Sequence, residues 1–131
     1  MADLYYPAVF TPEDDGYVVH FPDINGCITE GDTLEEAYEM AYDALGITLS
    51  VYSDENKELP PSTPPTAHNL EEGQFLVLIR FNMLEYLEKT DNKAVKKTLT
   101  IPSWMNSKAL RNNINFSQVL QDALKEELGM E

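Results

Sequence analysis

Carboxylates are the most numerous side chains in this sequence that could do chemistry. In the first third of the chain they occur in turns and at the ends of predicted elements: Asp14, Asp15, Asp23 and Glu30. Two-metal nucleases need several carboxylates converging within about 4 Å of two cations, usually from the centres of adjacent strands. Because none of these residues occupies a strand centre, the sequence predicts no catalytic centre and no metal site.

Other reactive side chains are few. The chain has one cysteine, Cys27, so an internal disulfide is excluded, and its two histidines are isolated from each other in sequence. They form no Cys/His metal constellation. His20 lies between apolar neighbours, no Ser or Cys has an obvious base, and Cys27 reads as a small buried residue. We therefore expect a protein without cofactors that is not an enzyme, in a reducing compartment.

The charge is strongly and unevenly acidic. The 131 residues carry a net charge of −14, and residues 1–72 alone, with sixteen acidic residues and one lysine, carry −15. Residues 89–112, with six basic residues and one acidic residue, carry +5. An acidic body repels phosphate over a Debye length of about 8 Å, so any nucleic-acid contact is expected in the basic window. The acidic body either attracts a basic partner or simply favours solubility.

Composition indicates a globular protein without a membrane partner. Hydrophobic residues make up 43% of the chain and charged residues 24%, without a run of eighteen apolar residues. The first ten residues, MADLYYPAVF, lack the basic and apolar regions of a signal peptide. We expect a cytoplasmic location.

The acidic part of the chain has the pattern of a small sheet with a packed helix. Residues 4–11 and 17–22 read as a hairpin, and an amphipathic helix follows Thr33, which has the capping-box spacing to Glu36. Gly46 weakens that helix, so packing must hold it. After a proline-rich loop, the apolar run QFLVLIRF is expected to be a central strand under the helix.

The last third reads as one short strand followed by two helices. In VKKTLTIPSW the side chains alternate, and Asn115 with Gln118 marks the start of the second helix. About 35 residues are too few to bury their own core, so we expect two copies to pair their strands antiparallel under four helices. The expected dimer core is Leu99, Ile101, Trp104, Val119, Leu120 and Leu124.

This segment, KKTLTIPSWMNSKALRNNINFSQVLQDALKEEL, resembles the ribbon-helix-helix DNA-binding fold. The resemblance implies that a two-stranded ribbon enters the major groove, with Lys96, Thr98 and Thr100 reading base edges. It also implies phosphate contacts at the start of the second helix and beside the ribbon, from Lys97, Asn115 and Phe116.

The first domain carries a second resemblance. YPAVFTPEDDGYVVHFPDINGCITEGDTLEEAYEMAYDAL is similar to the N-terminal domain of HicB antitoxins, with FPDINGCITEGDTLEEA its most specific part. The expected fold is therefore α+β: a partial ribonuclease-H-like sheet and helix in residues 1–90, then a ribbon-helix-helix dimerisation domain in residues 95–131. The resemblance implies an antitoxin that covers the active site of a HicA-like mRNA-cleaving toxin and, as a dimer, binds the operator of its own operon. A higher assembly of toxin and antitoxin is expected.

Three acidic residues on a predicted exposed edge are the candidates for toxin contact: Asp23, Glu30 and Asp32. Asp32 also suits the start of the helix, where negative charge complements the helix dipole. Two other functions remain open from the residues alone. One is a stand-alone ribbon-helix-helix regulator with a sensory first domain, although no phosphate-binding glycine loop supports it. The other is a nuclease, against which the scattered carboxylates argue.

Overall fold

The computed structural model describes residues 3–91 and 93–130. The described chain divides into two compact units, one of residues Asp3–Tyr86 and the other from Leu87 onward. The first unit, with seventeen acidic residues against Lys57 and Arg80, has a net charge of −15. We refer to the second unit as the tail.

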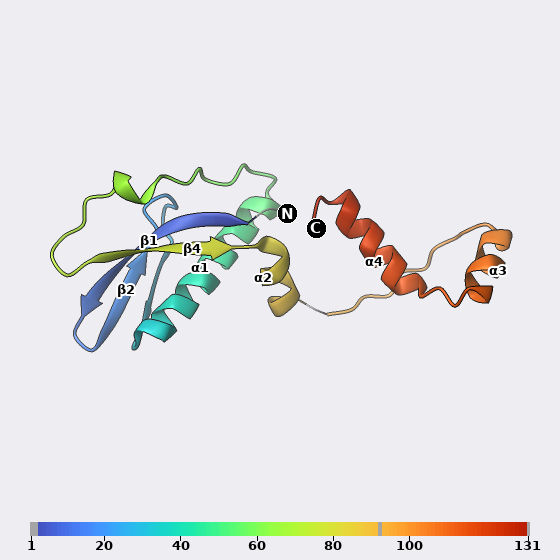
Figure 1. Ribbon diagram of the computed structural model, residues 1–131, viewed down its shortest axis with the longest axis horizontal. Helices are drawn as coiled ribbons and strands as arrows, with labels where there is room; N and C mark the ends of the chain where they lie inside the picture. The colour runs from blue at the N-terminus through green and yellow to red at the C-terminus, as the bar shows by residue number, and fades with distance from the viewer. Residues whose placement is uncertain (1–2, 92, 131) are drawn as a thin grey trace. The chain divides into compact units, whose positions relative to one another are not determined.

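A four-stranded antiparallel sheet organises the first unit (Figure 1). Its strands, in the order β3-β2-β1-β4, are β1 (Leu4–Glu13), β2 (Gly16–His20), β3 (Ile28–Gly31) and β4 (Phe75–Phe81). The predicted hairpin of β1 and β2 is confirmed, and its turn places Asp14 at a φ of 45°. The sequence pattern does not predict β3, which is only four residues long. It follows a loop that is closed by a hydrogen bond of 3.1 Å from the Phe21 N–H to the Cys27 carbonyl oxygen.

The prediction of a central strand in QFLVLIRF is wrong, because β4 lies at the edge of the sheet and β1 occupies the centre. Leu78 in β4 is 44% exposed, whereas Pro7 and Val9 in β1 are buried. In this sheet a continuous run of apolar residues therefore forms an edge strand. Which strand is buried on both faces depends on residues 57–74, the loop that covers the face of the sheet away from α1.

Helix α1 (Leu34–Asp54) packs on one face of the sheet. The Thr33 hydroxyl oxygen accepts a hydrogen bond from the Glu36 N–H at 3.1 Å, which confirms the predicted N-cap. The residues it buries recur with helical spacing: Ala37, Ala41, Leu45, Gly46 and Leu49. The spacing of the buried residues makes α1 one layer of a two-layer core.

Helix α2 (Met83–Thr90) follows β4. Its Tyr86 side chain explains why position 46 of α1 is a glycine. A Cβ on Gly46 would overlap the Tyr86 ring, closer than real carbon contacts approach. The Tyr86 ring also packs on the Phe81 ring, with 5.7 Å between the ring centroids. The Phe81 ring centroid lies 5.3 Å from that of Tyr42 in α1. The absent side chain therefore makes room for an aromatic cluster between α1, α2 and β4.

Residues 57–74, which we call the strap, connect α1 to β4 along the other face of the sheet (Figure 1). The Ser62 hydroxyl donates to the Tyr5 carbonyl, and the Gln74 side-chain amide donates to the Thr11 hydroxyl at 2.9 Å. Cross-strand partners share a face, so pairing with β4 places Pro7 and Val9 on the face away from α1, between these two anchors. The strap thus covers the centre of a face that α1 leaves open.

The tail holds two helices, α3 (Ser103–Arg111) and α4 (Phe116–Glu127). The predicted cap of α4 is confirmed, because the Asn115 side-chain oxygen accepts from the Gln118 N–H at 3.1 Å. Asn113, at a φ of 54°, takes the left-handed conformation expected between the helices. Residues 93–102 form neither helix nor strand in this single chain. A strand at residues 95–101 therefore stays a prediction that requires a second chain.

Candidate functional site: an acidic hollow and an apolar tail

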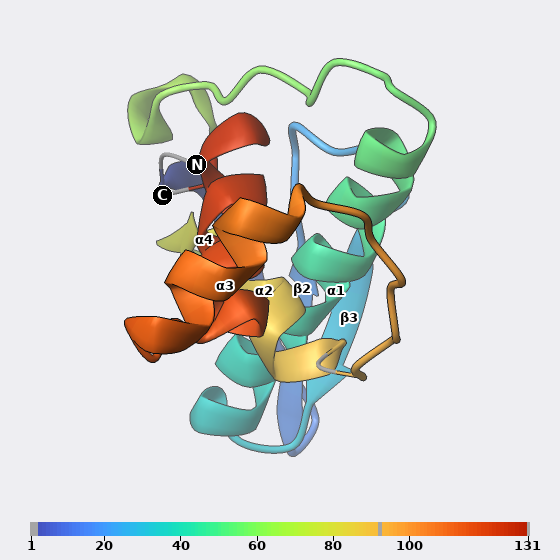
Figure 2. The same cartoon turned by 90° about the vertical axis from the view of Figure 1, so that its right-hand side faces the viewer.

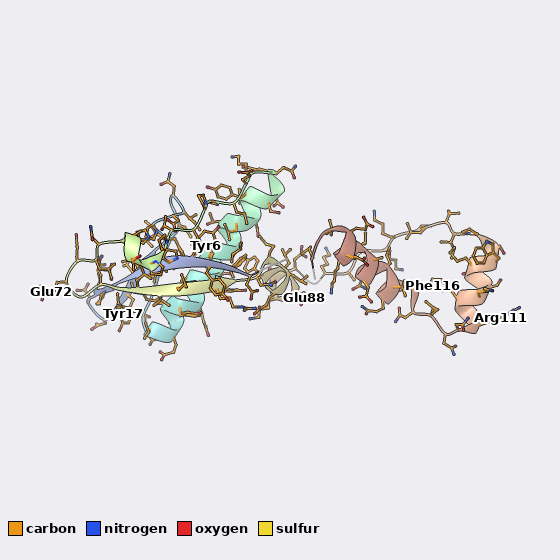
Figure 3. All side chains as sticks on the ribbon, turned by 45° about the horizontal axis from the view of Figure 1, so that its top comes forward. Tyr6, Tyr17, Glu72, Glu88, Arg111 and Phe116 are labelled. Carbon is orange, nitrogen blue, oxygen red and sulfur yellow. The ribbon has the colours of Figure 1, made fainter. Side chains whose placement is uncertain are left out.

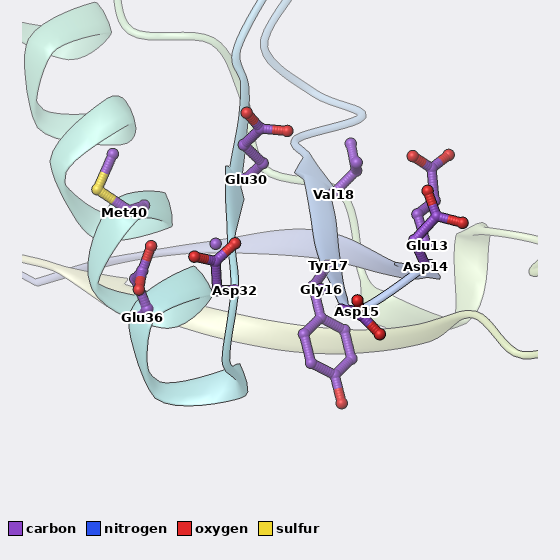
Figure 4. Close-up of a pocket in the computed structure, with 11 residues that line it drawn as sticks. Glu13, Asp14, Asp15, Gly16, Tyr17, Val18, Glu30, Asp32, Glu36 and Met40 are labelled. Atoms are coloured by element: carbon purple, nitrogen blue, oxygen red, sulfur yellow. The ribbon is translucent and has the colours of Figure 1, made fainter.

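A surface hollow of about 620 Å³ lies where the β1–β2 turn, the end of β3 and the start of α1 meet. Figure 4 shows the carboxylates that line it: Glu13, Asp14, Asp15, Glu30, Asp32 and Glu36. Its other lining residues, among them Tyr17 and Met40, include no basic side chain. Six carboxylates without a counter-charge create a negative potential that attracts Lys and Arg side chains.

Two of the three acidic residues predicted to contact a toxin line this hollow. They are Glu30 and Asp32, both exposed. Sequence reasoning missed the hairpin carboxylates and Glu36, because only the pairing of Tyr17 with Gly31 brings the hairpin turn beside the end of β3. The signal available was the density of acids in EDDG, although the sequence does not state what that turn faces.

Asp23 lies outside the hollow and anchors the strap. Its carboxylate accepts from the Thr63 N–H at 2.9 Å and from the Thr63 hydroxyl at 2.7 Å. The Thr63 oxygen lies 2.6 Å from Nε2 of His68, so the imidazole N–H is the donor in this pair when the hydroxyl donates to Asp23. A nucleophile activated by a base needs the imidazole between hydroxyl and carboxylate, and this order is different. The cluster holds the strap in place.

The remaining reactive groups are packed into the fold. Cys27 is 3% exposed, and the Thr48 hydroxyl lies 3.7 Å from its sulfur. Burial raises the pKa of the Cys27 thiol, which disfavours the nucleophilic thiolate. His20 is half-buried in β2, opposite Val9 and Ile28. Within residues 3–91 and 93–130, no cluster of three or more His, Cys, Asp or Glu side chains could hold a metal ion.

The tail exposes most of its large apolar side chains. No residue of α3 or α4 is buried, and Leu99, Trp104 and Val119 of the predicted dimer core are 63%, 63% and 53% exposed. Ile101 and Leu124 are exposed at 42% and 50%, and Leu120 is half-buried. Monomeric proteins rarely leave so many large apolar side chains of one short segment exposed to water. The apolar side chains of the tail therefore have the exposure expected of a domain whose hydrophobic core is completed by a second chain.

The predicted DNA-contact residues are all on the tail surface. Lys96, Lys97, Thr98 and Thr100 are exposed in the segment without regular structure. Figure 3 shows Phe116 at the first turn of α4, where backbone N–H groups at a helix start can bind phosphate. Arg111 ends α3 and adds positive charge to the same unit. The predicted base contacts would require the paired ribbon.

None of the described helices is both long and apolar enough to cross a membrane.

The family model of the HicB-like antitoxin of bacterial toxin–antitoxin systems matches residues 6–122. Antitoxin HicB 1 of Photorhabdus laumondii is 44% identical over 63 residues, which cover 47% of this chain and 41% of that protein. The chain thus matches less than half the length of this relative.

Two further similarities extend over more of the chain. An uncharacterised 14.9 kDa protein from the rep-hol intergenic region of Haemophilus phage HP1 is 33% identical over 102 residues, 76% of this chain and 74% of that protein. A chain in a toxin–antitoxin complex from Streptococcus pneumoniae is 29% identical, with a TM-score of 0.62 over 96% of this chain and 99% of that one. The chain therefore belongs to the HicB-like antitoxin family.

Proposed function

We propose that this chain neutralises a HicA-like ribonuclease toxin by covering its active site, and that its dimer represses its own operon in the cytoplasm. The observation that carries the proposal is the family match across residues 6–122, which spans both units. Support comes from the similar chain in the Streptococcus pneumoniae complex, a structure of a toxin with its antitoxin. The prediction that the chain is not an enzyme agrees with membership of an antitoxin family.

The first unit suits a basic, RNA-binding partner. Its net charge of −15 attracts such a protein over long range and raises the association rate. We assign direct contact to Glu30 and Asp32 in the hollow. Asp23 contributes by holding the strap through Thr63, and its half-buried carboxylate is the third proposed toxin contact. Neutralisation is then stoichiometric, since covering a site needs one antitoxin surface for each toxin.

The tail suits dimerisation and operator binding. Pairing of two copies would satisfy the backbone of residues 95–101 and bury the exposed apolar side chains of the tail. The paired ribbon would present Lys96, Thr98 and Thr100 from each chain to base edges, while Lys97 and the α4 N-terminus bind phosphate. Toxin and operator would then be linked through one dimer, so repression would depend on the ratio of toxin to antitoxin.

One pair of assays tests both activities on the same variant. Thr98→Ala with Thr100→Ala should weaken binding of the chain to its operator DNA by about tenfold or more, because each lost hydroxyl hydrogen bond contributes about 0.5–1.5 kcal/mol and both chains of the dimer lose two. Inhibition of RNA cleavage by a HicA-like toxin should stay stoichiometric and unchanged. Binding of DNA by the wild type should also fall steeply as salt rises, because phosphate contacts release counterions.

The matched control is Ser107→Ala with Thr90→Ala, which removes two hydroxyls outside the predicted ribbon. It should bind the operator like the wild type at the same salt. If the variant Thr98→Ala with Thr100→Ala binds the operator as tightly as this control, the assignment of Thr98 and Thr100 as base-reading residues is wrong. If wild-type chain leaves toxin cleavage of RNA unaffected at a molar excess, the neutralising function itself is wrong.

A further inference from the structure

Helix α1 has a second apolar stripe, which the core of the protein does not use. Met40, Ala44, Ile47 and Val51 recur at intervals of four, three and four residues, which places them within an arc of about 60° on the helix. The buried stripe that faces the sheet, from Ala37 to Leu49, occupies a different arc. Met40, Ile47 and Val51 are 41%, 55% and 50% exposed. We call these four residues the α1 stripe.

The α1 stripe begins inside the acidic hollow. Met40 and Glu36 line the hollow from α1, opposite Glu30 and Asp32 at the end of β3 (Figure 4). Figure 2 shows α1 and β3 side by side, and β3 is an edge strand of the sheet. The hollow and the stripe therefore form one continuous surface along this side of the first unit.

Carboxylates border the stripe along α1. The helix carries five acidic residues and no basic one, and Glu36, Asp43 and Asp54 lie on the solvent side next to the stripe. An apolar centre with a charged rim is the usual composition of a protein–protein interface. The single sign of the rim selects a partner whose matching rim is basic.

Local stability does not explain the choice of residues. Ile and Val have lower helix propensity than the Glu, Lys or Gln that would suit a solvent-facing position. Ile47 and Val51 therefore weaken the helix slightly and leave apolar area in water. A local choice that opposes the stability of its element is expected where a surface has another role.

We propose that the α1 stripe, together with the acidic hollow, is the surface on which the toxin docks. The occupant is a small basic protein with an apolar patch inside its basic RNA-binding face. Side chains at i, i+4, i+7 and i+11 are the anchors by which a helix enters an apolar groove. Ile47 and Val51 are the central anchors, and the hollow receives Lys or Arg side chains from the rim of the toxin. This inference rests on the proposed neutralising function and adds which surface performs it.

The test measures binding of the full chain to a purified, catalytically inactive variant of a HicA-like toxin. Ile47→Gln with Val51→Gln should raise the Kd at least tenfold, which corresponds to about 1.4 kcal/mol. Gln has a higher helix propensity than either residue it replaces, so α1 should remain folded. Circular dichroism and a thermal melt check this. Leu78→Gln is the matched control, because Leu78 is 44% exposed on the face of β4 away from α1, and it should change the Kd by less than twofold.

A second variant tests the rim. Glu36→Gln with Asp43→Asn should lower the association rate constant several-fold at low salt and flatten its salt dependence, with a smaller change in dissociation. Glu71→Gln with Glu72→Gln, exposed in the strap, is the control for a loss of two charges and should have less effect.

The outcomes separate the surface from the function. If the wild type binds the inactive toxin and the double substitution Ile47→Gln with Val51→Gln leaves the Kd within twofold, the docking surface is wrong while neutralisation stands. If the wild type does not bind at all, the proposed function fails first. If the same double substitution lowers the mass of the free chain in solution, the stripe holds a second copy of this chain, and that result also overturns the assignment.

Discussion

Single residues in this protein are explained by neighbours that are distant in sequence. Gly46 lies in the middle of α1, where glycine costs about 1 kcal/mol relative to alanine. The reason is Tyr86, distant in sequence, whose ring occupies the place of the missing Cβ. The sequence shows that packing must hold Gly46, but only the structure identifies the partner.

Gly46→Ala should therefore destabilise the protein, against the prediction of helix propensity. The clash with the Tyr86 ring should cost about 1–3 kcal/mol, more than the propensity gain. Chemical denaturation of the full chain measures the free energy of unfolding. The same substitution in a Tyr86→Leu background is the control, because the smaller side chain removes the clash and should reduce the cost or reverse its sign. Equal losses in both backgrounds would mean that the ring does not exclude the methyl group.

Buried Cys27 shows a residue whose environment the sequence does predict. A lone cysteine among apolar residues reads as buried, and the structure leaves it 3% exposed. The raised pKa of its thiol follows from that burial. Since the folded state disfavours the thiolate, this group contributes stability below its unfolded pKa, and the contribution falls as pH rises through the folded pKa.

At the scale of elements, local signals predict helices well and the sheet order less well. Thr33 and Asn115 each accept the hydrogen bond that their capping pattern predicts, because a cap depends on residues three positions apart. The hairpin also follows from local turn chemistry. The order of the strands depends on loops that cross the sheet, and for this reason the sequence pattern omits β3 and assigns β4 to the centre.

The strap is the element that the sequence describes least. Its prolines indicate a loop, although they do not indicate that it covers Pro7 and Val9. Thr63 joins the strap to Asp23 through its backbone N–H and its hydroxyl, and the same hydroxyl contacts His68 within the strap. Because Asp23 belongs to the loop between β2 and β3, this junction ties the strap to the end of these two strands that lies away from the acidic hollow.

Thr63→Val keeps the shape of the side chain and removes its hydroxyl. It should lower the free energy of unfolding by about 1–3 kcal/mol, because the Asp23 carboxylate loses a hydrogen bond in a half-buried place. The strap should also become more susceptible to limited proteolysis. Thr66→Val is the matched control: Thr66 is exposed in the same segment and should tolerate the change within about 0.5 kcal/mol. If Thr63→Val and Thr66→Val had the same free energy of unfolding and were cleaved in the strap at the same rate, the Thr63–Asp23 junction would not be what holds the strap.

At the scale of the whole molecule, the charge split along the sequence corresponds to the division into two units. The first unit carries −15, while the tail holds Lys96, Lys97, Lys108 and Arg111. The sequence therefore limits any nucleic-acid contact to the basic window of the tail, whereas the acidity of the first unit suits either a basic partner or solubility alone. The α1 stripe is not recognisable from the sequence, because Met40, Ile47 and Val51 read as ordinary helix residues until their exposure is known.

The exposed tail is the strongest reason to expect a second chain. In one chain the helices α3 and α4 bury none of their residues, and residues 93–102 have no strand partner. The proposed operator recognition, its proposed link to the toxin and the burial of Leu99 and Trp104 would all depend on the pairing of two tails.

Sedimentation equilibrium of the full chain without toxin or DNA, at low micromolar concentration, measures this most directly. The expected result is twice the mass of one chain, and Leu99→Lys with Ile101→Lys should convert it to a monomer that retains a folded first unit. A wild-type chain that stays folded through its tail at the mass of a single chain would contradict the pairing.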